Sequence, residues 1–352
     1  MKKYQIVELA GNHNHAGTKA TADIANVATG LGYEVCNVTM CTTKPGKVNK
    51  LKRQIGFLKD WNKAYKTIEA GSFVLLQHPF HYPQITREKI LRKLKDKKHV
   101  KFISVVHDVE ELRAFRYNDY YKHEFEVMLE LADIIIVHNE KMLKYFVDNG
   151  VPESKLVNLK IFDYLQDNKN SVPRFEKAIT IAGNLDITKC GYIGELRKLT
   201  TVGVKLYGPN FDETMKELPN VNYMGSFPAN EIPSKLVSGF GLVWDGTSID
   251  GCVGQSGQYL RYNNPHKLSL YLSSCMPVVI WKEAAEASFV KEHNVGLCVD
   301  SVLELEDIFK KLTKEEYDEM AANAASLSDA LIKGEYASQA ITRAEKSVEK
   351  QK

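Results

Sequence analysis

Apolar residues in the first half of the chain form short runs that alternate with longer amphipathic segments. The runs are expected to be strands, at residues 4–9, 33–38, 72–77, 100–106 and 134–137. Between them lie segments with apolar residues at helical spacing, at residues 19–31, 44–66, 86–97 and 120–131. Continuous apolar strands that alternate with helices are typical of a parallel sheet covered on both faces. The first half therefore predicts an α/β domain.

The same alternation returns after a polar stretch, residues 167–173, which lacks apolar periodicity and is predicted to link two domains. Further strands are expected at residues 178–182, 204–207, 221–224, 241–245 and 277–281. Helices are expected at residues 192–198, near 212, after 234 and after 265. We therefore predict an N-terminal domain at 1–166, a C-terminal domain at 174–335 and a terminal helix at 336–352.

Polar residues follow two predicted strands of the first half at the points where these strands end. His78 follows the strand 72–77, and His107 and Asp108 follow the strand 100–106. Open α/β sheets bind ligands at the carboxyl ends of their strands. The pattern therefore predicts that these three residues lie beside a ligand.

The loop after the first strand, residues 10–18, lies at the same edge of the predicted sheet and carries Gly17 and Thr18 as binding candidates. Its glycines do not form G-x-G-x-x-G, so a dinucleotide fingerprint is not supported. For His13 and His15, a role in binding and simple exposure on the loop both stay open.

A polar, basic cluster in the segment 259–281 precedes a short amphipathic helix and an apolar strand. The helix is expected to begin after Pro265. The cluster comprises Arg261, Tyr262, Asn263, Asn264, His266 and Lys267. A helix N-terminus surrounded by such residues favours negative charge. The segment therefore indicates recognition of a diphosphate, with an ordinary polar surface loop as the alternative.

The composition fits a globular protein of two domains. The 352 residues are 44% apolar and 26% charged, and no apolar run reaches the length of a membrane span. The N-terminus lacks the features of a signal peptide. A net charge of +3 is too small to indicate nucleic-acid binding. The six cysteines form no C-x-x-C pair, so we expect reduced thiols in a cytoplasmic protein.

Lysines and Arg53 are concentrated in the predicted amphipathic helix 44–66. Helices of this kind can lie on anionic lipid surfaces. The alternative is a surface helix whose basic face is solvated and whose apolar face packs on its own domain. The sequence leaves both interpretations open, so peripheral contact with the inner face of the plasma membrane is one hypothesis.

Three sequence motifs resemble those of a known enzyme family. The pattern N-x-P-x-K, followed by a helix and P-V-V-I, resembles the donor-binding segment of GT-B glycosyltransferases. The wording D-G-x-S-x-D, G-x-Y-L-R-Y-N-N-P-H-K-x-S-L-Y-L and P-V-V-x-W resembles a narrower bacterial group. That group holds glucosyltransferases that extend glycans on streptococcal serine-rich adhesins, and related β-1,6-galactofuranosyltransferases. The resemblance covers most of the chain and is strongest at 241–296.

The resemblance implies a GT-B fold, with two Rossmann-like domains whose parallel sheets face a central cleft, and a C-terminal helix that packs back on the N-terminal domain. It implies a UDP-sugar donor whose diphosphate is bound by Lys267 and Arg261. The hydrogen-bonding partners in that site would be Tyr262, Asn263 and Asn264.

Further donor contacts are implied in the second half of the chain. The resemblance assigns the nucleotide base to the loop that contains Ser226 and Phe227, and it assigns Asn184 to the diphosphate. Tyr207 is a further candidate of the nucleotide-sugar site. Asp250 either binds sugar hydroxyls or stabilises its own loop. No D-x-D motif ends a predicted strand, so neither a metal nor another cofactor is expected.

On the acceptor side, transfer with inversion needs a general base. Asp108 is the first choice and His107 the second, whereas Gly17, Thr18 and His78 are candidates for the acceptor side of the cleft.

The predicted function is transfer of glucose or galactofuranose from a UDP-sugar to a protein-linked or lipid-linked glycan by a homo-oligomeric enzyme. Two alternatives stay open: a non-catalytic GT-B module that binds a partner glycosyltransferase or a glycan, and a UDP-sugar epimerase. An epimerase needs no acceptor, so product analysis with donor alone separates it from a transferase.

Overall fold

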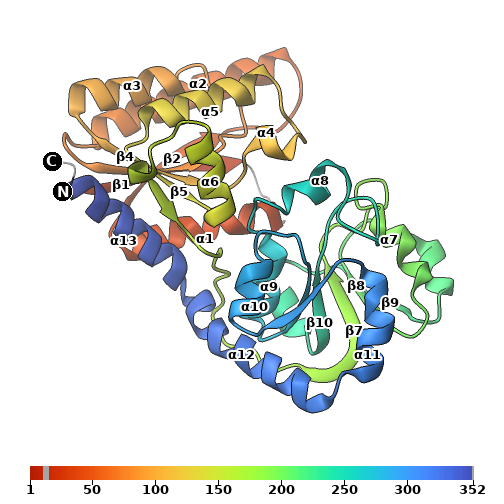
Figure 1. Cartoon of the computed structure of the whole chain (residues 1–352). Helices are drawn as coiled ribbons and strands as arrows, with labels where there is room; N and C mark the ends of the chain where they lie inside the picture. The colour runs from red at the N-terminus through yellow and green to blue at the C-terminus, as the bar shows by residue number, and fades with distance from the viewer. Residues whose placement is uncertain (11–15, 351–352) are drawn as a thin grey trace. The chain divides into compact units, whose positions relative to one another are not determined.

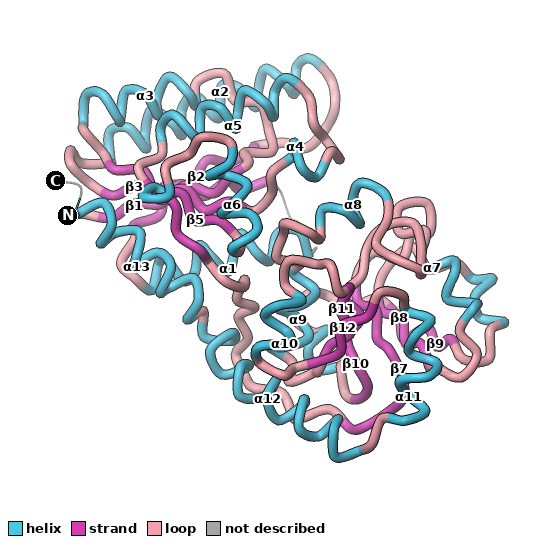
Figure 2. Tube along the Cα trace, viewed as in Figure 1, coloured by secondary structure: helices cyan, strands magenta, loops and turns pink. Residues whose placement is uncertain are grey.

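The computed structural model describes residues 1–10 and 16–350, which form two compact units (Figures 1 and 2). Unit 1 comprises residues 1–112, 116–159 and the C-terminal segment from Ala337, and unit 2 comprises 113–115 and 160–336. Each unit contains a six-stranded sheet in which every paired strand runs parallel to its neighbours. The predicted α/β class with parallel sheets is therefore confirmed.

The sheet of unit 1 has the order β2-β1-β3-β4-β5-β6. Its strands are β1 (Lys3–Ala10), β2 (Glu34–Met40), β3 (Phe73–His78), β4 (Lys101–Val106), β5 (Ile134–Val137) and β6 (Leu156–Asn158). The helices that accompany it are α1 (Ala16–Gly30), α2 (Lys47–Thr67), α3 (Arg87–Lys98), α4 (Glu110–Arg113), α5 (Asp119–Leu131), α6 (Glu140–Asp148) and α13 (Glu335–Lys350).

Helices cover both faces of the sheet in unit 1. Figure 1 shows α2, α3 and α5 side by side on one face, and α1 and α13 on the other. Phe57 and Trp61 of α2 are buried against the strands. Helix α13 is attached to unit 1 by Glu345, which accepts a hydrogen bond from the Tyr33 hydroxyl at 2.8 Å and forms an ion pair with Lys3.

The sheet of unit 2 has the order β12-β11-β10-β7-β8-β9. Its strands are β7 (Arg174–Ala182), β8 (Gly203–Tyr207), β9 (Val221–Gly225), β10 (Ser238–Val243), β11 (Val278–Trp281) and β12 (Gly296–Val299). Its α-helices are α7 (Tyr192–Glu195), α8 (Gly254–Tyr259), α9 (His266–Ser273), α10 (Ala287–Glu292), α11 (Leu305–Lys311) and α12 (Lys314–Lys333).

The order of strands defines one topological switch point in each sheet. In unit 1 the chain continues from β1 to β2 on one side and later adds β3 on the other side. In unit 2 the strand β7 is flanked in the same way by β8 and β10. Ligands of open α/β sheets bind beside the carboxyl ends of the strands at such points. The loops after β1, β3, β7 and β10 are therefore the first places to look for a site.

The observed elements follow most predicted ones, with several local differences. The glycine-rich residues 251–257 were expected to form a loop, and this was wrong for residues 254–257, which belong to α8. No helix follows Ser234, because a 3-10 turn at Ile232–Lys235 leads almost directly into β10. The predicted terminal helix corresponds to α13, which Gly334, at a φ of 78°, separates from α12. Strand β12 was not predicted.

The predicted linker, residues 167–173, lies within unit 2, because the chain joins that unit from Lys160 onward. Lys169 Nζ donates to Asp329 Oδ2 at 2.7 Å, which attaches this stretch to unit 2. All six cysteines are free thiols, as expected.

Candidate functional site

Lys267 lies at the switch point of unit 2, in the first turn of α9. Its Nζ donates a hydrogen bond to the carbonyl oxygen of Trp244, just beyond the end of β10, at 3.1 Å. Its Cε lies 3.5 Å from the position that a Cβ on Gly183 would take, just beyond the end of β7. The side chain therefore spans the carboxyl ends of the two strands that flank the switch point.

Two glycines allow the loops at this edge to approach each other closely. Gly183 has a φ of 151°, and its N–H donates to the carbonyl of Tyr207 at 2.9 Å. A Cβ on Gly208 would overlap the carbonyl oxygen of Gly183. The loops after β7 and β8 are thus in backbone contact, which a larger residue at position 208 would prevent.

The charge of Lys267 is maintained by its surroundings. Burial lowers the pKa of this ammonium group, but the carboxylate of Asp245 and the groups of Cys190 and Tyr271 raise it, and the net pKa is above the ordinary value. Lys267 is therefore protonated at neutral pH. The N-cap of α9 is Pro265, which provides no capping side chain, so the positive end of the helix dipole adds to this charge.

The polar residues before α9 have different environments. Asn264 is buried, and its amide donates to the carbonyl of Lys160 at 3.1 Å. Asn263 Oδ1 is buried and has no hydrogen-bond partner among the described residues. Tyr262 is half-buried. Asn264 thus positions the loop, and Asn263 has an unused acceptor.

Arg261 is partly exposed and already has partners. It forms an ion pair with Glu283, its Nε donates to Gln258 Oε1 at 2.9 Å, and its guanidinium lies 4.7 Å from the centre of the Trp281 ring. A phosphate at Arg261 would therefore have to compete with Glu283.

An aromatic surface lies at the carboxyl ends of β8 and β9. Phe227 is half-buried, with its ring 6.4 Å from that of Tyr207 and 5.1 Å from Lys235 Nζ. Tyr207 is buried, and its hydroxyl donates to the carbonyl of Lys235 at 3.0 Å. Ser226 is exposed beside them. Lys235 was not predicted as part of this surface, because a helix was expected to begin there, whereas the residue ends a 3-10 turn.

Asn184 and Asp250, the two other candidates in unit 2, contribute mainly to their own loops. Asn184 is exposed, and its Oδ1 accepts a hydrogen bond from Asn210 at 2.8 Å. Asp250 accepts a hydrogen bond from the Ser301 hydroxyl at 3.1 Å and lies 3.9 Å from Lys198 Nζ. Among the described residues, Asp250 makes no hydrogen bond to the segment 261–267.

In unit 1, Glu8 lies near the end of β1 at the switch point, and the sequence analysis missed it. Its carboxylate accepts hydrogen bonds from the Gln84 side chain and from the backbone N–H of His81. Burial raises the pKa of Glu8 to about 7, although Arg87 and both hydrogen bonds oppose this shift. The available signal was a carboxylate near the carboxyl end of a predicted strand.

The predicted residues of unit 1 lie at the same edge of its sheet. His78 is buried at the end of β3, and burial, together with Arg87 and His81, lowers the pKa of His78 to about 3. It is therefore neutral at physiological pH. His107 Nε2 lies 2.7 Å from Gln77 Oε1, and Asp108 is half-buried beyond the end of β4.

Of the candidates in the loop after β1, Gly17 and Thr18 lie in the first turn of α1. His13 and His15 lie outside the described residues.

The described residues contain neither a group of metal-binding side chains nor a helix that could span a membrane. In residues 1–10 and 16–350, no three His, Cys, Asp or Glu side chains are grouped as metal ligands. No helix within this part of the chain has the length and apolar character needed to cross a membrane.

Comparison with known proteins identifies relatives along nearly the whole chain. The family model for the N-terminal domain of glucosyltransferase 3-like proteins matches residues 3–161, and the model for the C-terminal domain matches 179–344. The chain is 35% identical over 244 residues to the β-1,6-galactofuranosyltransferase WbbI of Escherichia coli K12, covering 67% of this chain and 68% of that protein. It is 24% identical over 327 residues to glucosyltransferase 3 of Streptococcus gordonii, covering 92% of each.

Solved structures share the fold at low sequence identity. Anabaena HepE, in complex with UDP and glucose, has a TM-score of 0.60 at 11% identity, covering 99% of this chain and 100% of that chain. WaaG, a glycosyltransferase of lipopolysaccharide biosynthesis, has a TM-score of 0.57 at 12% identity, covering 96% of this chain and 98% of that chain. The two six-stranded parallel sheets, each in its own α/β unit, thus match those of GT-B glycosyltransferase structures.

Proposed function

Because the chain belongs to the glucosyltransferase 3-like family of glycosyltransferases, we propose that it transfers a hexose, galactofuranose or glucose, from a UDP-sugar to a glycan. The curated relatives named above are a galactofuranosyltransferase and a glucosyltransferase. A protein of the same fold has been solved with UDP and glucose. The observation that carries the proposal is the protonated Lys267 at the switch point of unit 2.

Lys267 would bind the diphosphate of the donor and stabilise it as the leaving group. Negative charge grows on the leaving oxygen in the transition state, and donors already in place lower the barrier. An ammonium group has more donors than its bond to the Trp244 carbonyl uses. The N-terminus of α9 adds further positive potential, so the charge is balanced in this proposal by protein groups without a metal ion.

The aromatic surface after β8 and β9 would bind the uracil base. Phe227 presents a flat apolar ring, and the exposed Ser226 adds a hydroxyl next to it. Tyr207 would support Phe227 from the core, because its own hydroxyl is occupied by the Lys235 carbonyl. Asn184 would bind the diphosphate. The unused Oδ1 of Asn263 would accept a hydrogen bond from a hydroxyl of the sugar.

For the acceptor we propose an inverting reaction in which Asp108 takes the proton of the attacking hydroxyl. Asp108 is half-buried at the carboxyl edge of the unit 1 sheet, where ligands of such sheets bind. His107, beside it, is the second choice. Glu8 is a further carboxylate at this edge, and its raised pKa favours proton transfer near neutral pH.

The test is release of UDP from UDP-galactofuranose and from UDP-glucose, with and without a glycan acceptor. We expect release that depends on the acceptor, with one of the two donors preferred. Formation of an epimerised sugar from donor alone would support the epimerase instead. Failure to bind either donor would support the non-catalytic module.

A further inference from the structure

Helix α2 has a row of large apolar side chains that its own unit does not cover. Val48, Leu51, Ile55 and Leu58, here called the apolar stripe, are between 45% and 68% exposed. Their spacing of three and four residues places them on one face of the helix. The opposite face is already buried in unit 1 through Phe57, Trp61 and Ala64. The apolar stripe is therefore available to contact a binding partner outside this unit.

A neighbouring loop extends the apolar stripe. The backbone N–H of Ile85 donates to Gln54 Oε1 at 3.1 Å, and Gln54 Nε2 donates to the carbonyl of Pro83 at 2.8 Å. These bonds hold the loop against α2. Ile85 itself is 81% exposed, which makes it one more large aliphatic side chain beside the helix. A contiguous exposed patch of this kind indicates an interaction surface.

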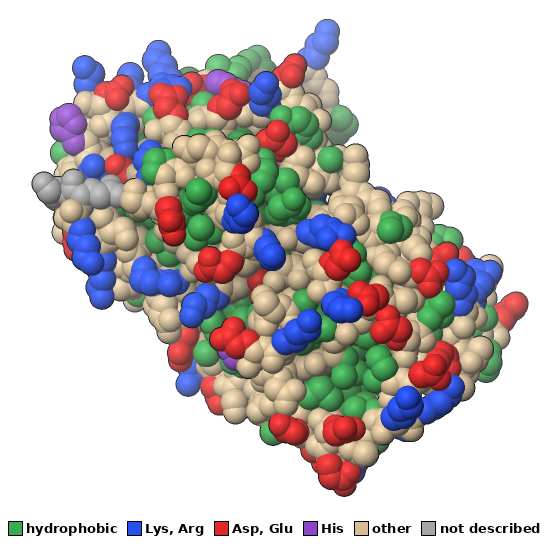
Figure 3. Space-filling model, viewed as in Figure 1, with side chains coloured by type: hydrophobic (Ala, Val, Ile, Leu, Met, Phe, Trp, Pro, Cys, Tyr) green, Lys and Arg blue, Asp and Glu red, His purple; other side chains and the backbone are tan. Residues whose placement is uncertain are grey.

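The charges around the apolar stripe are almost entirely positive. Helix α2 contains seven basic residues and one acidic residue, Asp60. The basic residues are Lys47, Lys50, Lys52, Arg53, Lys59, Lys63 and Lys66. The six lysines are exposed, and none of them forms an ion pair with a described residue. In the face drawn in Figure 3, Lys and Arg side chains lie along the outline over α2 and α3.

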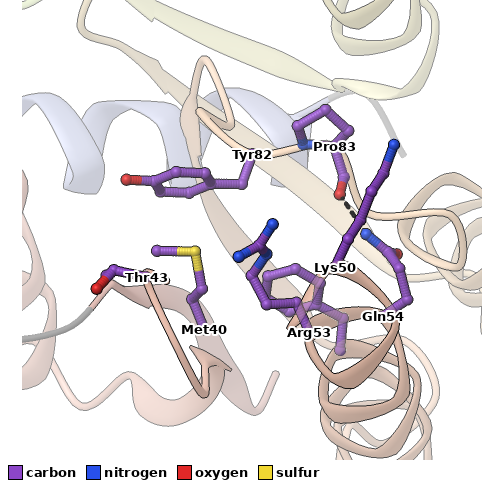
Figure 4. A pocket seen from close by; sticks show the side chains of 8 residues that line it. Met40, Thr43, Lys50, Arg53, Gln54, Tyr82 and Pro83 are labelled. Carbon is purple, nitrogen blue, oxygen red and sulfur yellow. Dashed lines mark hydrogen bonds between the residues drawn. The ribbon is translucent and has the colours of Figure 1, made fainter. Parts of the chain in front are cut away.

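A cavity of about 300 Å³ opens beside α2 (Figure 4). It is lined by Met40, Thr43, Lys50, Arg53, Gln54, Phe57, Tyr82 and Pro83. Arg53 Nη1 donates to the carbonyl of Lys44 at 2.9 Å, which fixes the guanidinium at the opening. Figure 4 shows this group directed toward Tyr82 and Met40. Lys50 and Arg53 both line this cavity, so it contains two basic side chains of the kind that bind phosphate.

We propose that α2 docks unit 1 on an anionic lipid bilayer, with the apolar stripe in the headgroup region and a lipid phosphate held in the cavity by Lys50 and Arg53. The net positive charge of α2 favours an anionic bilayer over a second copy of the chain as the binding partner. A second copy of the same surface would oppose six net positive charges with six more, which disfavours symmetric pairing. A bilayer that carries anionic lipid complements both the stripe and the charge. This inference does not rest on which sugar is transferred.

The test is co-sedimentation of the full-length protein with vesicles of phosphatidylcholine alone or mixed with phosphatidylglycerol. We expect binding to the mixed vesicles that weakens as salt is added, and little binding to phosphatidylcholine. Leu51→Asp with Ile55→Asp should reduce the binding constant by more than about tenfold. Lys50→Ala with Arg53→Ala should reduce it by about tenfold.

The matched control removes two exposed lysines from the neighbouring helix α3, by Lys93→Ala with Lys97→Ala. This variant loses the same charge and should bind the mixed vesicles within about twofold of the wild type. Equal loss from both charge variants would overturn the phosphate site in the cavity. No binding to mixed vesicles at low salt would overturn docking altogether. Self-association in solution that the Leu51 and Ile55 variant abolishes would instead identify the apolar stripe as a contact between copies.

Discussion

Lys267 lies beside Gly183 at the switch point of unit 2, because the Cε of the lysine is 3.5 Å from the position that a Cβ at residue 183 would take. The lysine belongs to α9 and the glycine follows β7. The positively charged side chain of Lys267 therefore lies next to the loop after β7. Ligands of open α/β sheets bind at this edge, where positive charge favours an anionic group.

The glycine contacts at this edge predict a stability effect. Gly208→Ala would place a Cβ onto the carbonyl oxygen of Gly183, at a φ of 144° that favours glycine. We expect a loss of about 2 kcal/mol or more in the free energy of unfolding, and weaker UDP binding. Thermal and urea unfolding measure the first effect, and calorimetric titration measures the second.

The control for that variant is Gly194→Ala, because a Cβ there meets no atom within 4 Å among the described residues. It should leave both stability and UDP binding nearly unchanged. A Gly208→Ala protein as stable as the Gly194→Ala protein would contradict the backbone contact.

Glu8 predicts a pH dependence of stability. Burial raises its folded pKa from 4.5 to about 7, so the folded state holds a proton that the unfolded state has released between these values. This contribution is complete below pH 4.5 and is lost as the pH rises through about 7. Relative to the wild type, the free energy of unfolding of Glu8→Gln should therefore rise by about 2 kcal/mol from pH 5 to pH 8. Urea unfolding at both pH values measures it, and a constant difference would rule out the raised pKa.

Asp108 predicts a separation between turnover and donor binding. Asp108→Asn should lower turnover by about 100-fold or more, because an amide cannot take the proton of the attacking hydroxyl group. UDP affinity should stay within about twofold of the wild type, because the residue lies in unit 1 and the donor residues lie in unit 2. Steady-state kinetics and calorimetry check the two effects. An equal loss of both would identify Asp108 as structural.

Phe227 predicts a loss of binding that depends on the base. Phe227→Ala should weaken UDP binding by about tenfold, which is typical for loss of one base-stacking aromatic ring. Inorganic pyrophosphate has no base, so its binding should be unaffected by this change. Calorimetric titration with both ligands provides the comparison. Equal weakening for the two ligands would contradict a base site at Phe227.

Local sequence patterns were sufficient to predict most elements and the helix that carries Lys267. Apolar runs marked the strands, and Pro265 followed by a basic residue marked the start of α9. Strand β12 was missed, because it begins with Gly296, which interrupts the apolar run and favours a turn. Helix α8 was missed, because its glycines favour a loop and the tertiary contacts of Gly257 decide its conformation.

Properties that depend on distant residues could not be read from the sequence. The pKa of Glu8 depends on His81 and Gln84, which are 73 and 76 residues away along the chain. The position of Asp250 depends on Ser301, which is 51 residues away. The buried environment of His78 arises only when Arg87 and Phe125 pack around it. Residue type suggested His78 and Asp250 as candidates, but folding determines the ionisation and partners of all three residues.

The most direct test of the account is calorimetric titration of UDP into the wild type, Lys267→Met and Lys282→Met. Lys282 is an exposed lysine paired with Asp300, so its variant removes the same charge outside the proposed site. We predict that Lys267→Met weakens UDP binding by about 10-fold to 100-fold, as expected for a charged hydrogen bond to phosphate. Lys282→Met should bind UDP as the wild type does. Unchanged UDP affinity in Lys267→Met, with its fold intact by thermal unfolding, would contradict the donor site at α9.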